Sequence, residues 1–138
     1  MPTNGASDWH LVETYKSILT FAVEALKMLA LVNGGAAVAV LTYLGNLVSR
    51  AGPGLSPPDM TPALHWYSSG LAATVFAFIA AYLTQLILFF EEKRRRGGGF
   101  IFPWHACGVG AGFTAALFSV FSFWMGCHAA ATALGSGH

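Results

Sequence analysis

Three long stretches of this chain contain no Asp, Glu, Lys or Arg, and they constrain its fold more than any other feature. The first is Met28–Ser49, a run of 22 residues between two basic side chains. The second lies within residues 60–90, and the third begins near residue 104. A helix of about 20 apolar residues crosses the roughly 30 Å hydrocarbon core of a bilayer. The sequence therefore predicts an all-α integral membrane protein with three transmembrane helices, at 28–49, 64–90 and 104–133.

The alternative is a soluble bundle, in which each helix would need one polar face turned to water. The second and third apolar stretches offer no such face. Charged residues make up only 9% of the chain, against about 25% in an ordinary soluble domain. We therefore interpret all 138 residues as a single membrane domain.

Most of the basic residues cluster between the second and third stretches, at Lys93, Arg94, Arg95 and Arg96. Lys and Arg next to transmembrane helices are retained on the cytoplasmic side, so segment 91–103 is expected to be a cytoplasmic loop. Three helices then place the N-terminus inside and the C-terminus outside. In this N-in/C-out orientation Lys16 and Lys27 also fall inside, and Arg50 is the one basic residue outside. We expect a multi-pass protein of the inner (cytoplasmic) membrane.

The remaining segments are short or polar. Residues 1–8 are expected to be a tail, 50–63 a proline-rich external loop, and 134–138 an external tail. Segment 9–27 is predicted to be an amphipathic helix, because polar residues recur on one side of it at helical spacing: Glu13, Lys16, Thr20, Glu24 and Lys27. Two placements remain open for this helix, one on the membrane surface and one extending into the cytoplasm.

Small residues recur at intervals of three or four in all three predicted spans. Such rows allow the backbones of membrane helices to approach closely. In the first span the row forms a packing face or a water-facing pore wall, made of Gly34, Val38, Thr42, Gly45 and Ser49. Further helix-packing positions are predicted at Gly35, Ala73, Ala77, Ala81, Gly108, Gly112 and Ala116.

Few polar side chains interrupt the apolar stretches. Asn33 and Gln85 fall at similar predicted depths, so we expect a hydrogen bond between them, worth about 0.6 kcal/mol. His65 and His128 fall near the outer face on different spans, which makes them weak candidates for a haem or metal site, with Cys127 as a further ligand. Apart from this weak candidate we expect no cofactor and no metal, because water can satisfy a histidine at a helix end.

The same pattern weighs against several classes of function. No acidic residue lies inside any span, so catalysis by intramembrane carboxylates has no carrier and we do not expect an enzyme. The basic residues do not form a patch interleaved with aromatic residues, so a nucleic-acid partner is not expected either.

Two hypotheses remain for the function. In the first, the protein associates with itself in the lipid bilayer through its small-residue faces, and the homo-oligomer can form a weakly selective pore or channel. In the second, it is a non-catalytic accessory subunit of a larger membrane complex of the respiratory, photosynthetic or transport kind.

Overall fold

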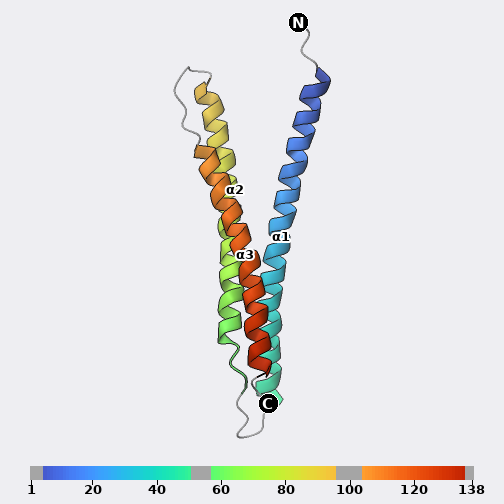
Figure 1. Ribbon diagram of the computed structural model, residues 1–138, viewed down its shortest axis with the longest axis vertical. Helices are drawn as coiled ribbons and strands as arrows, with labels where there is room; N and C mark the ends of the chain where they lie inside the picture. The colour runs from blue at the N-terminus through green and yellow to red at the C-terminus, as the bar shows by residue number, and fades with distance from the viewer. Residues whose placement is uncertain (1–4, 51–56, 96–103, 136–138) are drawn as a thin grey trace.

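The computed structural model describes residues 5–50, 57–95 and 104–135, and these residues form three helices (Figure 1). Helix α1 spans Gly5–Arg50, α2 spans Thr61–Arg95, and α3 spans Trp104–Gly135. All three are long and apolar enough to cross a membrane, within Trp9–Arg50, Thr61–Glu91 and His105–Gly135.

Helix α1 is a single unbroken helix of 46 residues, about 69 Å long at 1.5 Å per residue. It therefore contains both the predicted amphipathic segment 9–27 and the predicted span 28–49, and its first residues fall in the segment expected to be a tail. Two ion pairs lie on its N-terminal half, each between side chains one helical turn apart. Lys16 pairs with Glu13 at 3.0 Å, and Lys27 pairs with Glu24 at 2.7 Å. Both pairs are exposed, so each adds only a few tenths of a kcal/mol to helix stability.

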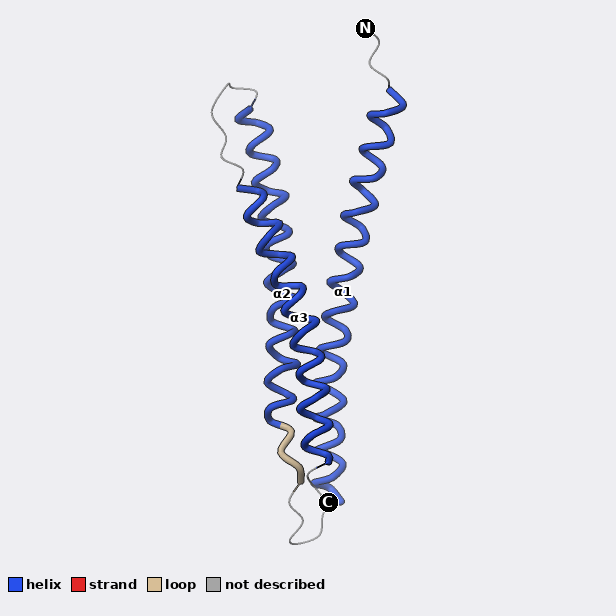
Figure 2. The backbone as a smooth tube through the Cα atoms, in the orientation of Figure 1, coloured by secondary structure: helices blue, strands red, loops and turns tan. Residues whose placement is uncertain are grey.

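Helices α2 and α3 run antiparallel and lie side by side, whereas α1 joins them along only part of its length. In Figures 1 and 2 the C-terminal half of α1 packs against the pair, and its N-terminal half diverges from it. Apolar side chains on the diverging half are accordingly exposed, among them Leu11, Ile18 and Phe21.

A carboxylate fixes the start of α2. Asp59 Oδ1 accepts a hydrogen bond from the backbone N–H of Thr61 at 3.0 Å, and the Met60 carbonyl accepts the first helical bond, from Leu64 N. The first N–H groups of a helix have no partner within the helix, so this contact satisfies one of them. The hydrogen bonds from Thr61 favour the ionised carboxylate and lower the pKa of Asp59 below its usual value.

Small residues form the contact between α2 and α3. The buried and half-buried positions of α3 alternate in steps of four and three residues: Gly108, Gly112, Ala115, Ser119, Ser122 and Gly126. This 3.5-residue period is that of a left-handed coiled coil. On α2 the matching buried positions are Ala63, Tyr67, Gly70, Thr74 and Ala77.

Glycines bring the two backbones close together. A Cβ atom at Gly108 would overlap the Thr84 hydroxyl, and one at Gly126 would lie 2.5 Å from the Tyr67 ring. At Gly112 a Cβ would lie 3.7 Å from that of Ala80, an ordinary contact. The α2–α3 seam thus depends on two positions that tolerate no side chain.

Among the predicted packing positions, Ala77 is buried, and Ala73, Gly108, Gly112 and Ala116 are half-buried. Gly35 and Ala81 are exposed. Ala73, Ala77 and Ala81 follow one another at intervals of four residues. Of these three, Ala77 therefore lies in the contact between α2 and α3, whereas Ala81 lies outside it. A 3.5-residue seam and a four-residue row diverge within two turns, which accounts for the difference.

Candidate functional site

Buried polar side chains from all three helices meet near the middle of the molecule. Asn33 Nδ2, on α1, donates to Ser119 Oγ on α3 at 3.0 Å. It also donates to the carbonyl oxygen of Leu29, one turn earlier in α1, at 3.1 Å. The Ser119 hydroxyl lies 2.8 Å from the Thr74 hydroxyl on α2. Thr74 Oγ1 in turn lies 2.9 Å from the carbonyl oxygen of Gly70. Asn33, Ser119 and Thr74 have no exposed surface; we call these three residues with Gly70 the polar junction.

The direction of these bonds follows from counting hydrogens. Each hydroxyl has one hydrogen to donate, and Thr74 gives its own to the Gly70 carbonyl. Ser119 must then donate to Thr74, and Asn33 to Ser119. The junction is a one-way chain from α1 through α3 to α2, an arrangement in which each bond polarises the next.

Gly70 makes this arrangement possible. The carboxamide of Asn33 occupies the space that a Cβ atom at position 70 would take. Asn33 Oδ1 and the Ser122 hydroxyl are buried and have no hydrogen-bond partner among the residues that the structure describes. The junction contains no titratable group, so it can fix the position of α1 on the hairpin but offers no acid, base or ionised nucleophile for chemistry.

The expected pairing of Asn33 with Gln85 is wrong. Gln85 Nε2 instead donates to the Tyr15 hydroxyl at 3.4 Å, beside the diverging half of α1. Asn33 meets α2 at Gly70, and Gln85 lies 15 residues further along, which is about 22 Å of helix. The predicted pairing takes the membrane depth of each residue from the charged ends of its apolar stretch. This depth is wrong for α1 relative to α2, because α1 is much longer than the span assigned to it.

Polar and aromatic contacts also hold the two ends of the α2–α3 hairpin. At one end His105 Nδ1 lies 2.9 Å from Glu91 Oε2, and the Glu91 side chain is only 17% exposed. At the other end the Tyr67 hydroxyl lies 3.5 Å from Cys127 Sγ, and the rings of Trp66 and Phe121 meet edge to face at 5.9 Å. Lys93, Arg94 and Arg95 continue α2, but their side chains and Arg96 lie outside the described residues.

The weak metal candidates, His65 and His128, are both exposed. The His128 ring lies 6.4 Å from that of Trp124. Within residues 5–50, 57–95 and 104–135 no group of three or more His, Cys, Asp or Glu side chains is placed to hold a metal ion.

The predicted face of the first span points away from the hairpin. At 3.6 residues per turn its members lie about 100–180° around the helix from Asn33; Val38 is 63% exposed, and Gly34, at the edge of this face, is half-buried. Around Gly34 and Gly45, as around Gly35, no described atom lies within 4 Å of where a Cβ would stand. We call Gly34, Val38, Thr42, Gly45 and Ser49 the outward face of α1.

Two polar groups along this face bind their own helix. Asn46 Nδ2 donates to the Thr42 carbonyl at 3.0 Å, and Ser49 Oγ donates to the Gly45 carbonyl at 2.8 Å. One N–H of Asn46, which lies beside the outward face, and the hydroxyl hydrogen of Ser49 are therefore bonded within α1, so this side of the helix is less polar than its sequence suggests.

Comparisons of the chain with protein-family models, with curated proteins and with solved structures find no match.

Proposed function

We propose that this chain is a non-catalytic membrane protein that associates with itself through the outward face of α1. It would cross the inner membrane three times, N-in and C-out, with the basic residues Lys93, Arg94, Arg95 and Arg96 in the cytoplasm. The observation that carries this proposal is the open space beside Gly34, Gly35 and Gly45, on the side of α1 turned away from the rest of the chain.

The other small-residue rows support this choice because they are already occupied. Gly108 packs against Thr84, Gly112 against Ala80, and Gly126 against Tyr67. Those contacts lie within one chain, so these three glycines offer no space to a second copy. In lipid, helix association depends on close van der Waals packing, and the outward face of α1 is a small-residue surface that the chain leaves open for it.

A packing role fits this face better than a pore lining. The donors of Asn46 and Ser49 are bound to backbone carbonyls, and no charged side chain interrupts the face between Gly34 and Ser49. Ion selectivity in a pore depends on backbone carbonyl groups or rings of charged side chains that face the ions. We therefore propose that the outward face joins protein to protein.

The test uses two differently tagged copies of the full chain, expressed together and extracted into lipid nanodiscs. The wild-type copies should co-purify. Gly34→Leu fills the open space and should abolish co-purification, and it should leave the fold in place because a Cβ at this position has no atom of α2 or α3 within 4 Å. Gly110→Leu on α3 is the matched control, because Gly110 is equally open, and it should co-purify like the wild type. Equal co-purification of both variants would contradict the proposal.

An accessory subunit is the second candidate, and the divergence of α1 favours it. The N-terminal half of α1 leaves the hairpin with large apolar residues exposed, Phe21 at 74%. A larger partner could pack against that surface. On this alternative the two tagged copies do not co-purify when expressed alone, and Leu11, Ile18 or Phe21 changed to Ser releases the chain from a complex isolated from native membranes.

A further inference from the structure

Two contacts fix the register of α1 against α2. Asn33 lies against Gly70, and Gln85 Nε2 donates to the Tyr15 hydroxyl at 3.4 Å. The two helices therefore run antiparallel, and α1 keeps running alongside α2 where it diverges sideways (Figure 1). The α1 residues between Tyr15 and Asn33 lie level with the α2 residues between Gly70 and Gln85.

This register places an ion pair of α1 level with the middle of α2. Lys27 Nζ lies 2.7 Å from Glu24 Oε1. Lys27 comes six residues before Asn33, so it is level with Phe76, six residues beyond the contact of Asn33 with α2. Phe76 is the middle residue of Thr61–Glu91, the part of α2 that is long and apolar enough to cross a membrane.

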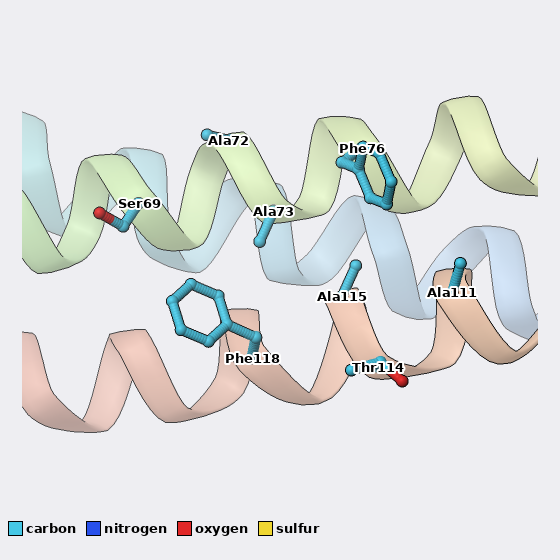
Figure 3. A pocket seen from close by; sticks show the side chains of 8 residues that line it. All are labelled: Ser69, Ala72, Ala73, Phe76, Ala111, Thr114, Ala115 and Phe118. Carbon is cyan, nitrogen blue, oxygen red and sulfur yellow. The ribbon is translucent and has the colours of Figure 1, made fainter.

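The hairpin is apolar at this level. Figure 3 shows Phe76 of α2 and Phe118 of α3 beside a shallow groove with Ala73 and Ala115 at its floor, and α1 runs behind it. Among the described residues no charged side chain lines this groove. Helix α3 contains no Asp, Glu, Lys or Arg. The ion pair of α1 thus stands beside helices that offer it no charged partner at its own level.

Both charged side chains point away from the hairpin. The half-buried side of α1 runs through Leu26 to Asn33, whereas Lys27 and Glu24 lie about 120° and 180° around the helix from Asn33. Their side chains are 56% and 59% exposed. Lys27 comes seven residues before Gly34, which is two turns earlier on the same side of the helix. The ion pair therefore continues the outward face of α1 towards its N-terminus.

In the membrane placement proposed above, the ion pair lies within the hydrocarbon core. A bilayer moved outward until Lys27 reached water would leave the second half of α2 in water as well. That half exposes six large apolar or aromatic side chains: Ile79, Tyr82, Leu83, Leu86, Phe89 and Phe90. One such side chain in water costs roughly as much as one charged side chain in a span. Six of them outweigh two charges, so the ion pair stays at the depth of the lipid tails.

An ion pair at this depth needs a polar partner. Ionisable side chains inside a membrane face protein or a water-filled space, and they pair with one another. Water at the inner end of the span is out of reach, because Glu91 lies 15 residues beyond Phe76, about 22 Å of helix. The contact between Glu24 and Lys27 cancels their net charge but leaves the exposed side of both groups turned to lipid.

We propose that Glu24 and Lys27 pair with Lys27 and Glu24 of a second copy, whose α1 helix lies parallel against the first. This inference rests on the self-association proposed above and extends its contact beyond Gly34. Copies related by rotation about an axis along the bilayer normal keep every residue at the same depth. Glu24 of one copy and Lys27 of the next then differ in depth by three residues, about 4.5 Å, which these long side chains span. Because the site carries one charge of each sign, it is complementary to itself.

The charges give the contact a defined register. A row of small residues permits several alignments of two helices, whereas a polar position inside a helix contact specifies one. A shift by seven residues would set Glu24 and Lys27 against Leu31 and Gly34 of the second copy and leave both charges without a partner between chains. The small residues thus set how closely the helices approach, and the ion pairs set their alignment.

Charge reversal tests the site in differently tagged full-length chains extracted into nanodiscs. One variant carries Glu24→Lys and the other Lys27→Glu, so each has two like charges in place of the ion pair. Expressed with itself under both tags, each variant should co-purify about tenfold less than the wild type, because like charges then meet. Expressed together, the two variants bring opposite charges into contact and should co-purify like the wild type.

Glu13→Lys and Lys16→Glu are the matched controls. Glu13 and Lys16 form the other exposed ion pair on this side of α1, and they lie near the level of Glu91, where water and salt screen them. Each should co-purify with itself like the wild type. Wild-type co-purification of Glu24→Lys and Lys27→Glu with themselves, or a mixture of the two that restores nothing, would overturn the charged site and leave self-association standing.

Cysteine cross-linking tests the same geometry with the native charges in place, so it does not depend on how the reversed charges insert. In chains with Cys107→Ala and Cys127→Ala, Leu31→Cys lies one turn after Lys27 on the same side of α1 and should form a disulfide-linked dimer under a mild oxidant. Phe21→Cys, also exposed but about 120° around the helix from Lys27, should give about tenfold less, since a disulfide needs Cα atoms within about 7 Å. Equal yields would overturn the parallel contact. Wild-type copies that do not co-purify would refute self-association itself.

Discussion

Gly70 has no Cβ, and the carboxamide of Asn33 occupies the place where one would be. Because Gly70 leaves this space free, the amide of Asn33 on α1 can lie close against α2 and reach Ser119 on α3. The chain of bonds from Asn33 to Ser119 to Thr74 then ties three helices together through side chains without exposed surface. At the residue scale, the contact between the three helices depends on the absence of a side chain at Gly70 and on the hydroxyl groups of Ser119 and Thr74.

Gly70→Ala should destabilise the protein by about 1–3 kcal/mol, the usual cost of overpacking a close contact. The added methyl overlaps the Asn33 amide, so α1 must shift or the junction must break. Gly110→Ala is the control, because its methyl would enter open space on α3. The free energy of unfolding is measured by denaturant titration in mixed micelles. Equal values for the two variants would mean that α1 does not pack on Gly70.

Ser119→Ala should cost about 0.6–1.7 kcal/mol, from the average to the largest value for hydrogen bonds between membrane helices. The change leaves Asn33 Nδ2 with only the more distant Ser119 carbonyl on α3, at 3.5 Å, and removes the donor to Thr74. A double-mutant cycle with Thr74→Ala checks the chain directly: the two losses should be less than additive, because each removes the same bond. Strictly additive losses would show that the two hydroxyls act independently.

At the scale of the helix, α2 is stabilised by a hydrogen bond at its first turn and by its contact with α3 along one side. The carboxylate of Asp59 accepts from Thr61 N at the start of α2. Along the side, the small residues of α3 recur every 3.5 residues and meet those of α2. The cap sets where the helix begins, and the seam sets how its neighbour lies against it.

The cap of α2 should make stability depend on pH in a defined direction. Its hydrogen bonds lower the pKa of Asp59 in the folded chain. The unfolded chain then binds this proton at higher pH than the folded one, so the contribution of the cap is fully present above the ordinary Asp pKa and is lost as the pH falls through the lowered value. Asp59→Asn should reduce the loss of stability between neutral and acidic pH, measured by the same titration. An unchanged pH profile would contradict the cap.

The sequence predicts which segments are helical better than it predicts how they meet. Three stretches without charge, each longer than a bilayer is thick, suffice to indicate three helices. They do not give the helix ends, since α2 continues through Glu91 to Arg95; charged residues end an apolar stretch without ending a helix.

The contacts between helices were harder to foresee. The sequence does not mark Ser119 and Thr74 as a contact between helices, because hydroxyls in membrane helices usually bind their own backbone; only the position of Ser119 on the 3.5-residue row of small residues marks it as buried. The sequence does mark Asn33 as a polar contact but does not identify its partner, since its depth depends on a 46-residue helix whose register against α2 is set by Gly70.

At the scale of the whole molecule, the hairpin of α2 and α3 is complete along its length, and α1 is attached to it over only part of its own. The polar junction holds α1 in place, and none of the described residues of α2 or α3 lies beside the glycines of the outward face of α1. Self-association gives this face a partner, and the proposed function depends on that claim.

The particle mass of the wild-type chain, expressed alone and extracted into lipid nanodiscs, tests that claim most directly. Mass photometry of the particles, corrected for lipid and scaffold, gives the number of 14.6 kDa chains in each. We expect one defined species of several chains, independent of the protein-to-lipid ratio. A uniform population with one chain per particle would contradict self-association and would favour the accessory subunit instead.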